Sequence, residues 1–163
     1  MEKSLKGAAF IAASMSACQA ERLDMLMYYD ARPSAMNGLF CTDFICDRLK
    51  GYYPFYMFNT LYALKNAVPV QAVAPLYCSA ARNGGKAAVM LTHFEDDDAA
   101  AAQQVCLALK GLNAGGGVRA KYYLLDQEHD MDLMREETFT GENCTAVLNM
   151  PNFSTVLVEL EEL

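Results

Sequence analysis

Four polar side chains that suit sugar recognition fall within one short stretch of the sequence. They are Tyr28, Asp30, Arg32 and Asn37. Their hydroxyl, carboxylate, guanidinium and amide groups form the kinds of hydrogen bond that the hydroxyls of a sugar require. The simpler interpretation is that Asp30 pairs with Arg32 and only fixes the path of the loop. The sequence leaves both interpretations open, and the four residues are our candidates for substrate binding.

The remaining carboxylates are not placed like catalytic or metal-binding groups. Glu95-Asp96-Asp97-Asp98 offers the oxygen ligands that Ca²⁺ prefers. The alternation, the glycine and the distal glutamate of an EF-hand loop are missing, so we predict a solvated loop. Glu128, Glu136 and Glu137 lack the paired apolar surroundings that tune an acid and a base. We therefore predict no catalytic residue among them.

The histidines and the clustered glycines also favour structural roles. His93 lies in an apolar run, and His129 stands beside Asp126 and Asp130. Neither histidine has a ligand partner at metal-binding spacing, so we predict hydrogen-bonding roles for both. The glycines at 115–117 are not followed by a helix, a Lys or a Ser, and they predict a turn rather than a phosphate site. The sequence therefore predicts no metal and no cofactor.

The cysteines and the start of the chain favour a cytoplasmic protein. No two cysteines have the two-residue spacing of a zinc or redox motif. They are Cys18, Cys41, Cys46, Cys78, Cys106 and Cys144. The apolar stretch 7–14 has the length of a signal-peptide core, but apolar residues continue at helical spacing and no clear cleavage site follows. We predict reduced thiols in the cytoplasm.

The composition is that of a folded chain with a sizeable core. Of the 163 residues, 53% are hydrophobic and 20% are charged, which excludes a disordered protein. The net charge of −7 argues against nucleic acid or an anionic membrane surface as a partner. No apolar run approaches the roughly twenty residues that span a bilayer.

The first part of the chain predicts two helices around one buried strand. Residues 4–19 place apolar side chains on one stripe, with Ser4 as the N-cap and many alanines that suit close packing against a sheet. Residues 53–65 form the second helix, with Pro54 in its first turn. Between them, Leu23–Tyr29 is almost wholly apolar, which is typical of a strand buried on both faces of a parallel sheet. That strand has no parallel partner in this chain.

After Pro69 the pattern changes to short strands separated by glycine-rich turns, such as Asn83-Gly84-Gly85. The predicted strands are 70–74, 76–82, 86–94, 104–110, 118–125, 144–149 and 154–161. We therefore predict a mainly β fold, with an antiparallel β-sandwich over residues 69–163 preceded by a helix–strand–helix segment over residues 1–68. The helices should pack against the sandwich, because their aromatic side chains need cover. These side chains are Tyr53, Phe55, Phe58 and Tyr62.

The order of motifs along the chain is more informative than any one of them. The apolar run is followed by Asp30-Ala31-Arg32-Pro33 and Asn37-Gly38-Leu39-Phe40, and then by Leu49-Lys50-Gly51-Tyr52-Tyr53-Pro54-Phe55. This order resembles the end of the (β/α)8 barrel in clan A glycoside hydrolases, most closely the family of β-xylosidases (family 39), and it implies a remnant of such a barrel here. A β-sandwich follows that barrel. The stretches Tyr122–Asp130 and Pro151–Leu160 look like its late strands.

The resemblance implies a chain without catalytic residues. In that family, glutamates at the ends of the fourth and seventh barrel strands act as acid and nucleophile. The matching motifs begin after the seventh strand, which implies that both catalytic positions lie upstream of Met1. Tyr28, Asp30, Arg32 and Asn37 would lie at the C-terminal rim of the last strand, where active sites gather. The family places a Trp at this rim, and the chain contains none.

We therefore predict the accessory C-terminal region of a β-xylosidase-like glycoside hydrolase, inactive alone because it lacks the catalytic glutamates. Its partners would be carbohydrate and a catalytic barrel that a longer chain or another subunit supplies. The alternative is a free-standing carbohydrate-binding or protein-interaction module, which aromatic side chains exposed on one sandwich face would favour. The unpaired apolar strand also predicts a homo-oligomer, because an open strand edge is adhesive.

Overall fold

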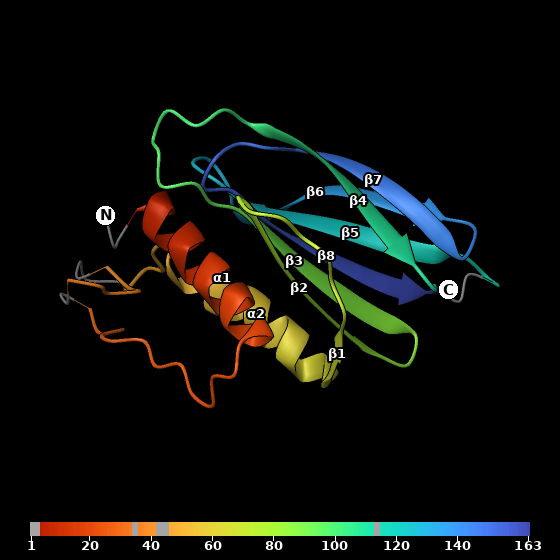
Figure 1. Ribbon diagram of the computed structural model, residues 1–163, viewed down its shortest axis with the longest axis horizontal. Coiled ribbons are helices and arrows are strands. Elements are labelled where there is room, and N and C mark those ends of the chain that lie inside the picture. Colours follow the sequence, from red (N-terminus) through yellow and green to blue (C-terminus); the bar gives the residue numbers. More distant parts are fainter. Residues whose placement is uncertain (1–3, 34–35, 42–45, 113–114) are drawn as a thin grey trace.

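The structure is a computed structural model that describes residues 4–33, 36–41, 46–112 and 115–163. Within these residues two helices precede eight strands (Figure 1). The helices are α1 (Leu5–Ala20) and α2 (Tyr52–Leu64), and neither is long and apolar enough to cross a membrane. The strands are β1 (Asn66–Val68), β2 (Leu76–Asn83), β3 (Lys86–His93), β4 (Gln103–Lys110), β5 (Val118–Leu125), β6 (Asp130–Phe139), β7 (Asn143–Met150) and β8 (Thr155–Glu162).

The strands pair antiparallel in two sheets that pack face to face. The larger sheet has the order β1-β2-β3-β8-β5-β6, and the smaller one pairs β4 with β7. Their inner faces meet in a core of aliphatic side chains, among them Val89 and Val158 of the larger sheet and Val105 and Met150 of the smaller one. The predicted antiparallel β-sandwich is therefore confirmed.

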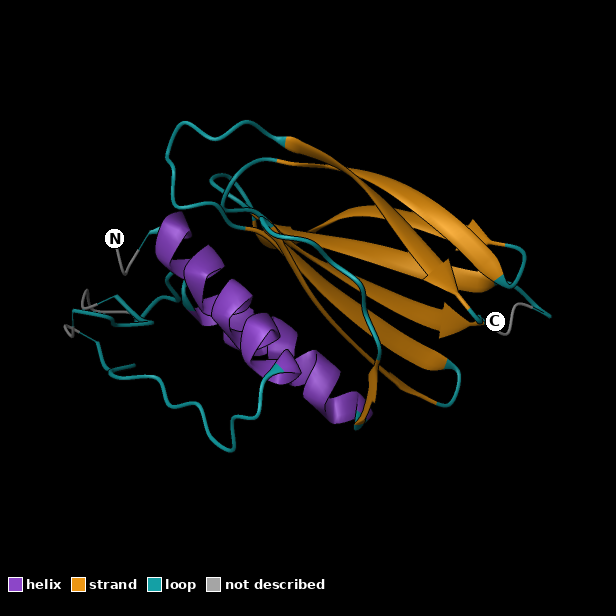
Figure 2. Ribbon diagram, in the orientation of Figure 1, coloured by secondary structure: helices purple, strands orange, loops and turns teal. Residues whose placement is uncertain are grey.

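Both helices pack on the outer face of the larger sheet, so the fold has three layers (Figure 2). Ala8 and Ala12 of α1 are fully buried, and their small side chains let the helix approach the strands closely. Met57 of α2 and Leu157 of β8 are also fully buried and fill the space between the helices and the sheet. The alanine-rich helix thus packs against a sheet, as predicted.

The local sequence explains where the helices begin and end. The hydroxyl of Ser4 accepts a hydrogen bond from the N–H of Gly7 at 3.4 Å and caps α1. Pro54 lies in the first turn of α2, where its missing N–H costs no hydrogen bond. α2 ends at Lys65, whose φ of 71° lies in the left-handed region. Both predicted helices are confirmed, each displaced by about one residue.

Two strand predictions after α2 need correction. The predicted strand 70–74 is wrong, because Pro69 and Pro75 bracket this stretch and it takes an irregular path. β1 lies just before it and is only three residues long. The sequence also missed β6, an edge strand in which most side chains are exposed and charged residues interrupt the alternation. Edge strands give weak sequence signals because one side needs no partner.

The segment Leu23–Tyr29 does not form the predicted buried strand. It is extended, but it pairs with no strand among the described residues, and most of its side chains are exposed. It leaves the end of α1 and runs outside the helical layer (Figure 1). A strand buried on both faces needs neighbouring strands and a covering layer on each side. The described residues place helices on one side of the segment and no strand beside it.

The aromatic side chains of α2 are covered unequally. Tyr53 and Phe58 pack against the core between the helices and the sheet. Phe55 packs against a smaller cluster that contains Leu39. Tyr62 remains 65% exposed. The expectation of cover is therefore right for three of these residues and wrong for Tyr62, which lies on the open side of the helix.

Candidate functional site

The candidate loop, residues 28–41, packs against the first turn of α2. The ring of Tyr28 meets the ring of Phe55 edge-on, with 5.1 Å between centroids. Both belong to a small cluster that also contains Ile11 and Met15 of α1 and Leu39 of the loop. The two helices therefore position the base of the loop through aromatic and aliphatic contacts.

Hydrogen bonds close the two ends of the loop on each other. The Tyr28 hydroxyl donates to the carbonyl oxygen of Asn37 at 2.7 Å, and Asn37 Nδ2 donates to the carbonyl oxygen of Tyr29 at 2.6 Å. The N–H of Leu39 donates to the carbonyl oxygen of Ala31 at 3.3 Å. Side chains separated in sequence thus fix a compact loop.

Asp30 and Arg32 form a local ion pair. Arg32 Nε donates to Asp30 Oδ2 at 2.6 Å, and the backbone N–H of Arg32 donates to Asp30 Oδ1 at 3.1 Å. That backbone hydrogen bond, together with the guanidinium, lowers the pKa of the Asp30 carboxyl below its ordinary value, so the group is ionised at neutral pH. A carboxylate held in this way accepts hydrogen bonds well, but it is a poor proton donor to a leaving group.

The structure brings all four predicted residues together in one loop. Substrate binding by them stays a prediction, because the hydrogen bonds above also account for the loop shape. Asn37 keeps one unused group, since its buried Oδ1 has no hydrogen-bond partner among the described residues. Asp30 is the only acidic residue from Tyr28 to Cys41. The loop alone therefore offers no carboxylate pair of the kind that retaining glycoside hydrolysis uses.

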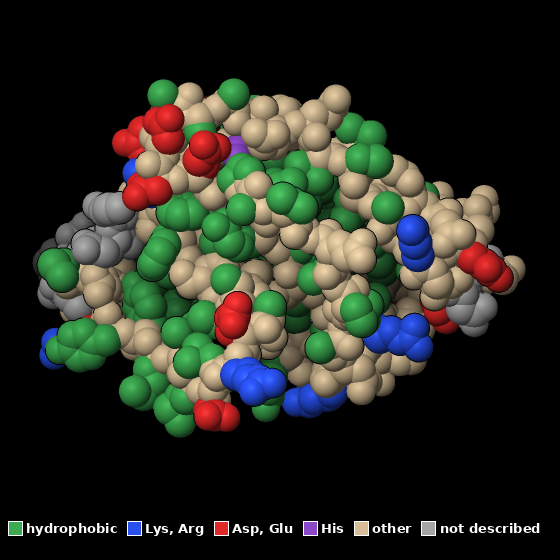
Figure 3. All heavy atoms as spheres, in the orientation of Figure 1, with side chains coloured by type: hydrophobic (Ala, Val, Ile, Leu, Met, Phe, Trp, Pro, Cys, Tyr) green, Lys and Arg blue, Asp and Glu red, His purple; other side chains and the backbone are tan. Residues whose placement is uncertain are grey.

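The stretch before the loop is an exposed apolar segment, which we call the open segment (residues 23–29). Met25 is 70% exposed, Met27 81% and Tyr29 81%. Hydrophobic side chains gather over this part of the molecule at the lower left of the space-filling view (Figure 3). Exposed apolar side chains in such a run are unusual on a soluble monomer.

The other candidates have structural partners. In the acidic run, Asp96 and Asp98 form ion pairs with Lys6 at 2.8 and 2.7 Å. Across the described residues, no group of acidic, histidine and cysteine side chains could hold a metal ion. His129 Nδ1 lies 2.8 Å from Asp126 Oδ1, and both belong to the turn before β6. The structural roles predicted for these residues agree with their contacts.

Sequence reasoning missed a second feature, at the opposite end of the helices. A hollow lies between the last turns of α1 and α2 and strand β2, with Ser16 and Ser79 in its lining. Both serines are buried, and each has apolar neighbours in the sequence. A buried serine on the inward face of a helix or strand was the available signal.

Comparison with known proteins finds likeness in structure only. No protein-family model matches the chain, and no curated protein matches it in sequence. A glucosidase from Croceicoccus marinus is similar to it in structure, with a TM-score of 0.82 and 15% identity over 98% of this chain. A family 39 glycoside hydrolase from Xanthomonas axonopodis pv. citri gives a TM-score of 0.75 at 13% identity over 99% of this chain. A monomeric β-xylosidase from Caulobacter crescentus gives 0.71 at 18% identity over 99%.

This chain covers 42% of each of these three proteins. Likeness at such identity concerns the fold and leaves substrate and activity open. It confirms the predicted resemblance to glycoside hydrolases of the β-xylosidase type at the level of the fold. The chain therefore has the fold of a part, about two-fifths, of such glycoside hydrolases.

Proposed function

We propose that the chain forms a non-catalytic portion of a glycoside hydrolase-like enzyme. In this proposal the β-sandwich holds the two helices in place, and the helices together with the open segment complete a barrel. The remaining barrel strands come from a longer chain or from another subunit. In this assembly the candidate loop lies at the rim of the barrel, where Asp30, Arg32 and Asn37 contribute to carbohydrate binding.

The single observation that carries this proposal is the open segment. In sequence it lies between two helices that both pack on the sandwich, yet its own apolar side chains face solvent. A parallel strand in a barrel has one strand on each side and a helical layer outside it. The helical layer is present here and the neighbouring strands are absent from the described residues. An incoming pair of strands would bury the exposed methionines and satisfy the backbone.

The proposed role excludes catalysis by this chain alone for a chemical reason. Retaining hydrolysis needs one carboxylic acid to protonate the leaving oxygen and a second carboxylate about 5 Å away as nucleophile. Asp30 is ionised and paired with Arg32, so it is not the acid, and the loop holds no second carboxylate to complete the pair. The catalytic pair must then come from the remainder of the barrel.

The alternative is a free-standing carbohydrate-binding module. The positions of the exposed aromatic side chains argue against it. Sugar-binding surfaces of this kind present flat rings to the solvent. Among the described residues of the sandwich, the exposed large hydrophobic side chains are all aliphatic: Val70, Val73, Leu133, Met134, Val147 and Leu163. The exposed rings belong instead to the helices and the open segment. This distribution supports a docking role for the helical layer.

The experiment is a hydrolysis assay of the purified chain with 4-nitrophenyl β-xyloside and 4-nitrophenyl α-arabinofuranoside. We expect no turnover above a buffer blank. Asp30→Asn tests the one carboxylate of the loop, and Asp47→Asn, an exposed residue after the loop, is the matched control. Turnover that the Asp30 variant loses and the Asp47 variant keeps would overturn the proposal.

A further inference from the structure

The hollow at the ends of the helices has a volume of about 530 Å³. The last turns of α1 and α2, residues 67–70 and strand β2 form its lining. Its volume lies in the range that proteins use for small ligands. The candidate loop contacts α2 at Phe55, and the residues from Phe58 to Lys65 that line the hollow begin about 5 Å further along that helix and extend to about 15 Å. The hollow shares Phe58 with the cluster under the loop, but no loop residue lines it.

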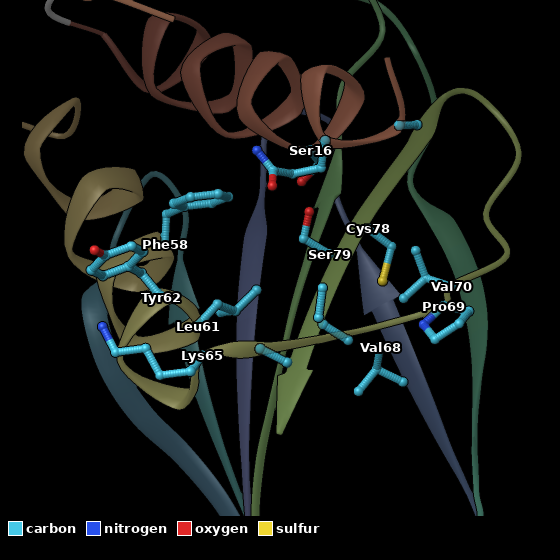
Figure 4. Close-up of a pocket in the computed structure, with 15 residues that line it drawn as sticks. Ser16, Phe58, Leu61, Tyr62, Lys65, Val68, Pro69, Val70, Cys78 and Ser79 are labelled. Atoms are coloured by element: carbon cyan, nitrogen blue, oxygen red, sulfur yellow. The ribbon is translucent and has the colours of Figure 1, made fainter. Parts of the chain in front are cut away.

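The greater part of the wall is apolar. Phe58 and Leu61 of α2 line it on the helix side of the larger sheet. Val68 and Cys78 line it from the other face of that sheet, in register with Ala80 and Leu91 (Figure 4). Burial raises the pKa of the Cys78 thiol to about 11, so the thiol is uncharged at neutral pH and acts as an apolar surface. Such a wall favours a ligand with an apolar body. It disfavours a free sugar, because each of the many sugar hydroxyls needs a partner.

Two buried hydroxyls stand at the inner end of the hollow. Ser16 is 5% exposed and Ser79 is 7% exposed, and neither Oγ has a hydrogen-bond partner among the described residues. Figure 4 shows both side chains pointing into the space between α1 and β2. Buried hydroxyls are almost always hydrogen-bonded. Both Oγ atoms are sealed from solvent as the side chains stand, so a rotation about the Cα–Cβ bond is needed to aim either serine at a ligand oxygen. The pair then suits one neutral hydroxyl or carbonyl group.

The opposite end of the hollow carries a positive charge. Lys65 Nζ lies 4.0 Å from the centroid of the Tyr62 ring, and both side chains are exposed. No carboxylate of the described residues forms an ion pair with Lys65. An anionic group at this rim keeps much of its hydration and gains the ammonium as a partner. The charge is notable because the whole chain has a net charge of −7.

From this arrangement we propose that the hollow binds a small hydroxyaryl carboxylate. The aromatic ring lies against Phe58 and Leu61, the hydroxyl meets Ser16 and Ser79 at the inner end, and the carboxylate meets Lys65 at the rim. The two serine hydroxyls have no hydrogen-bond partner among the described residues, and Lys65 has no ion-pair partner there. This site does not depend on the proposed function, and a positive hydrolysis assay would leave it standing.

The test is a titration of the full chain with 4-hydroxycinnamate, followed by NMR chemical shifts and by calorimetry. A ligand of this size should bind with a Kd of about 1 mM or below, at one site per chain. Cinnamate lacks the hydroxyl and methyl 4-hydroxycinnamate lacks the charge, and each should bind about two- to tenfold more weakly. Xylose, a polyol without an apolar body, should not bind in the hollow.

Variants identify the residues involved. Ser79→Ala should weaken 4-hydroxycinnamate binding about two- to tenfold without lowering the thermal midpoint, because the hydroxyl that it removes has no partner. Ser14→Ala changes a serine of α1 that does not line the hollow, and it is the matched serine control. Lys65→Gln should weaken the binding of 4-hydroxycinnamate and leave the binding of its methyl ester unchanged. Lys110→Gln, an exposed lysine of β4, is the matched charge control.

Three results overturn the site. The first is the absence of saturable binding of 4-hydroxycinnamate at concentrations up to 10 times the expected Kd of about 1 mM. The second is binding that neither Ser79→Ala nor Lys65→Gln weakens. The third is a fall in the thermal midpoint of Ser79→Ala, since a hydroxyl that stabilises the fold already has a partner. Weakening in both variants with an unchanged midpoint supports the site.

Discussion

The two helices and the open segment that joins them in sequence are all rich in apolar residues, but they differ in burial. Met57 of α2 is 0% exposed, whereas Met27 of the open segment is 81% exposed. The helices pack against small and flexible side chains on the outer face of the larger sheet, such as Ala81 and Met90. The open segment has no comparable face to pack against among the described residues. An apolar run thus becomes core only where the fold supplies a complementary surface.

The largest expected effect comes from truncating the same residue type in the two regions. Met57→Ala should lower the free energy of unfolding by about 2–5 kcal/mol, because it leaves a cavity between the helices and the sheet. Met27→Ala should change it by less than about 0.5 kcal/mol, because the side chain is already in solvent. Denaturant unfolding of both variants measures the difference. Equal losses in the two variants would mean that the open segment is buried in solution.

A smaller effect separates two adjacent tyrosines at the end of the open segment. The Tyr28 hydroxyl donates to the Asn37 carbonyl at 2.7 Å, while the Tyr29 side chain is 81% exposed. Tyr28→Phe should therefore cost about 0.5–1.5 kcal/mol, and Tyr29→Phe should stay within about 0.5 kcal/mol of the wild type. Urea unfolding gives both values. If the Tyr28 variant is as stable as the Tyr29 variant, the loop is not fixed by this hydrogen bond.

The smallest effect concerns the turn through which the sandwich contacts the start of α2. Lys50 Nζ donates to the His129 carbonyl at 3.0 Å in this turn. Burial alone would raise the pKa of Asp126, but hydrogen bonds from the N–H groups of Glu128 and His129 and from the His129 ring lower it overall. A lowered pKa contributes stability above about pH 4 that is lost as the pH falls through the folded-state value.

Asp126→Asn should therefore be less stable than the wild type at pH 7, and the difference should shrink as the pH falls below the ordinary pKa of an aspartate, about 4. The difference is small because the carboxylate keeps part of its hydration. Urea unfolding at several pH values gives the two stability curves. A difference that does not shrink with falling pH would show that the carboxylate charge does not stabilise the turn.

The sequence predicts elements well where a pattern repeats on one buried face. The helix α1 and the strand β4 form where their repeating apolar pattern predicts them, each with one buried face. β8 also forms where predicted, but it is buried on both faces because it lies inside the larger sheet, between the helices and the smaller sheet. Prediction fails at β6, whose exposed edge position removes the alternation, and at residues 70–74, where flanking prolines block pairing. The division of the chain at residues 68 and 69 stays a prediction.

The candidate loop and the hollow differ in how visible they are in sequence. The loop residues stand close together along the chain, so their polarity alone marks them. Ser16, Lys65 and Ser79 are distant in sequence and meet only through the packing of α1 and α2 on β2. No local pattern carries that information. The open segment is a third case, because its sequence is typical of a buried strand and the described residues place no strand beside it.

The central claim is that the open segment is a docking edge, and self-association tests it most directly. Sedimentation equilibrium of the wild type should show dimers or larger assemblies, because an extended, unpaired apolar segment favours association with another chain. The double variant Met25→Lys, Met27→Lys should be monomeric. Val147→Lys, at an exposed aliphatic position of β7 in the sandwich, should associate like the wild type. A wild type that stays monomeric at about 100 µM, a concentration that detects association with free energies near 5 kcal/mol, would contradict the account.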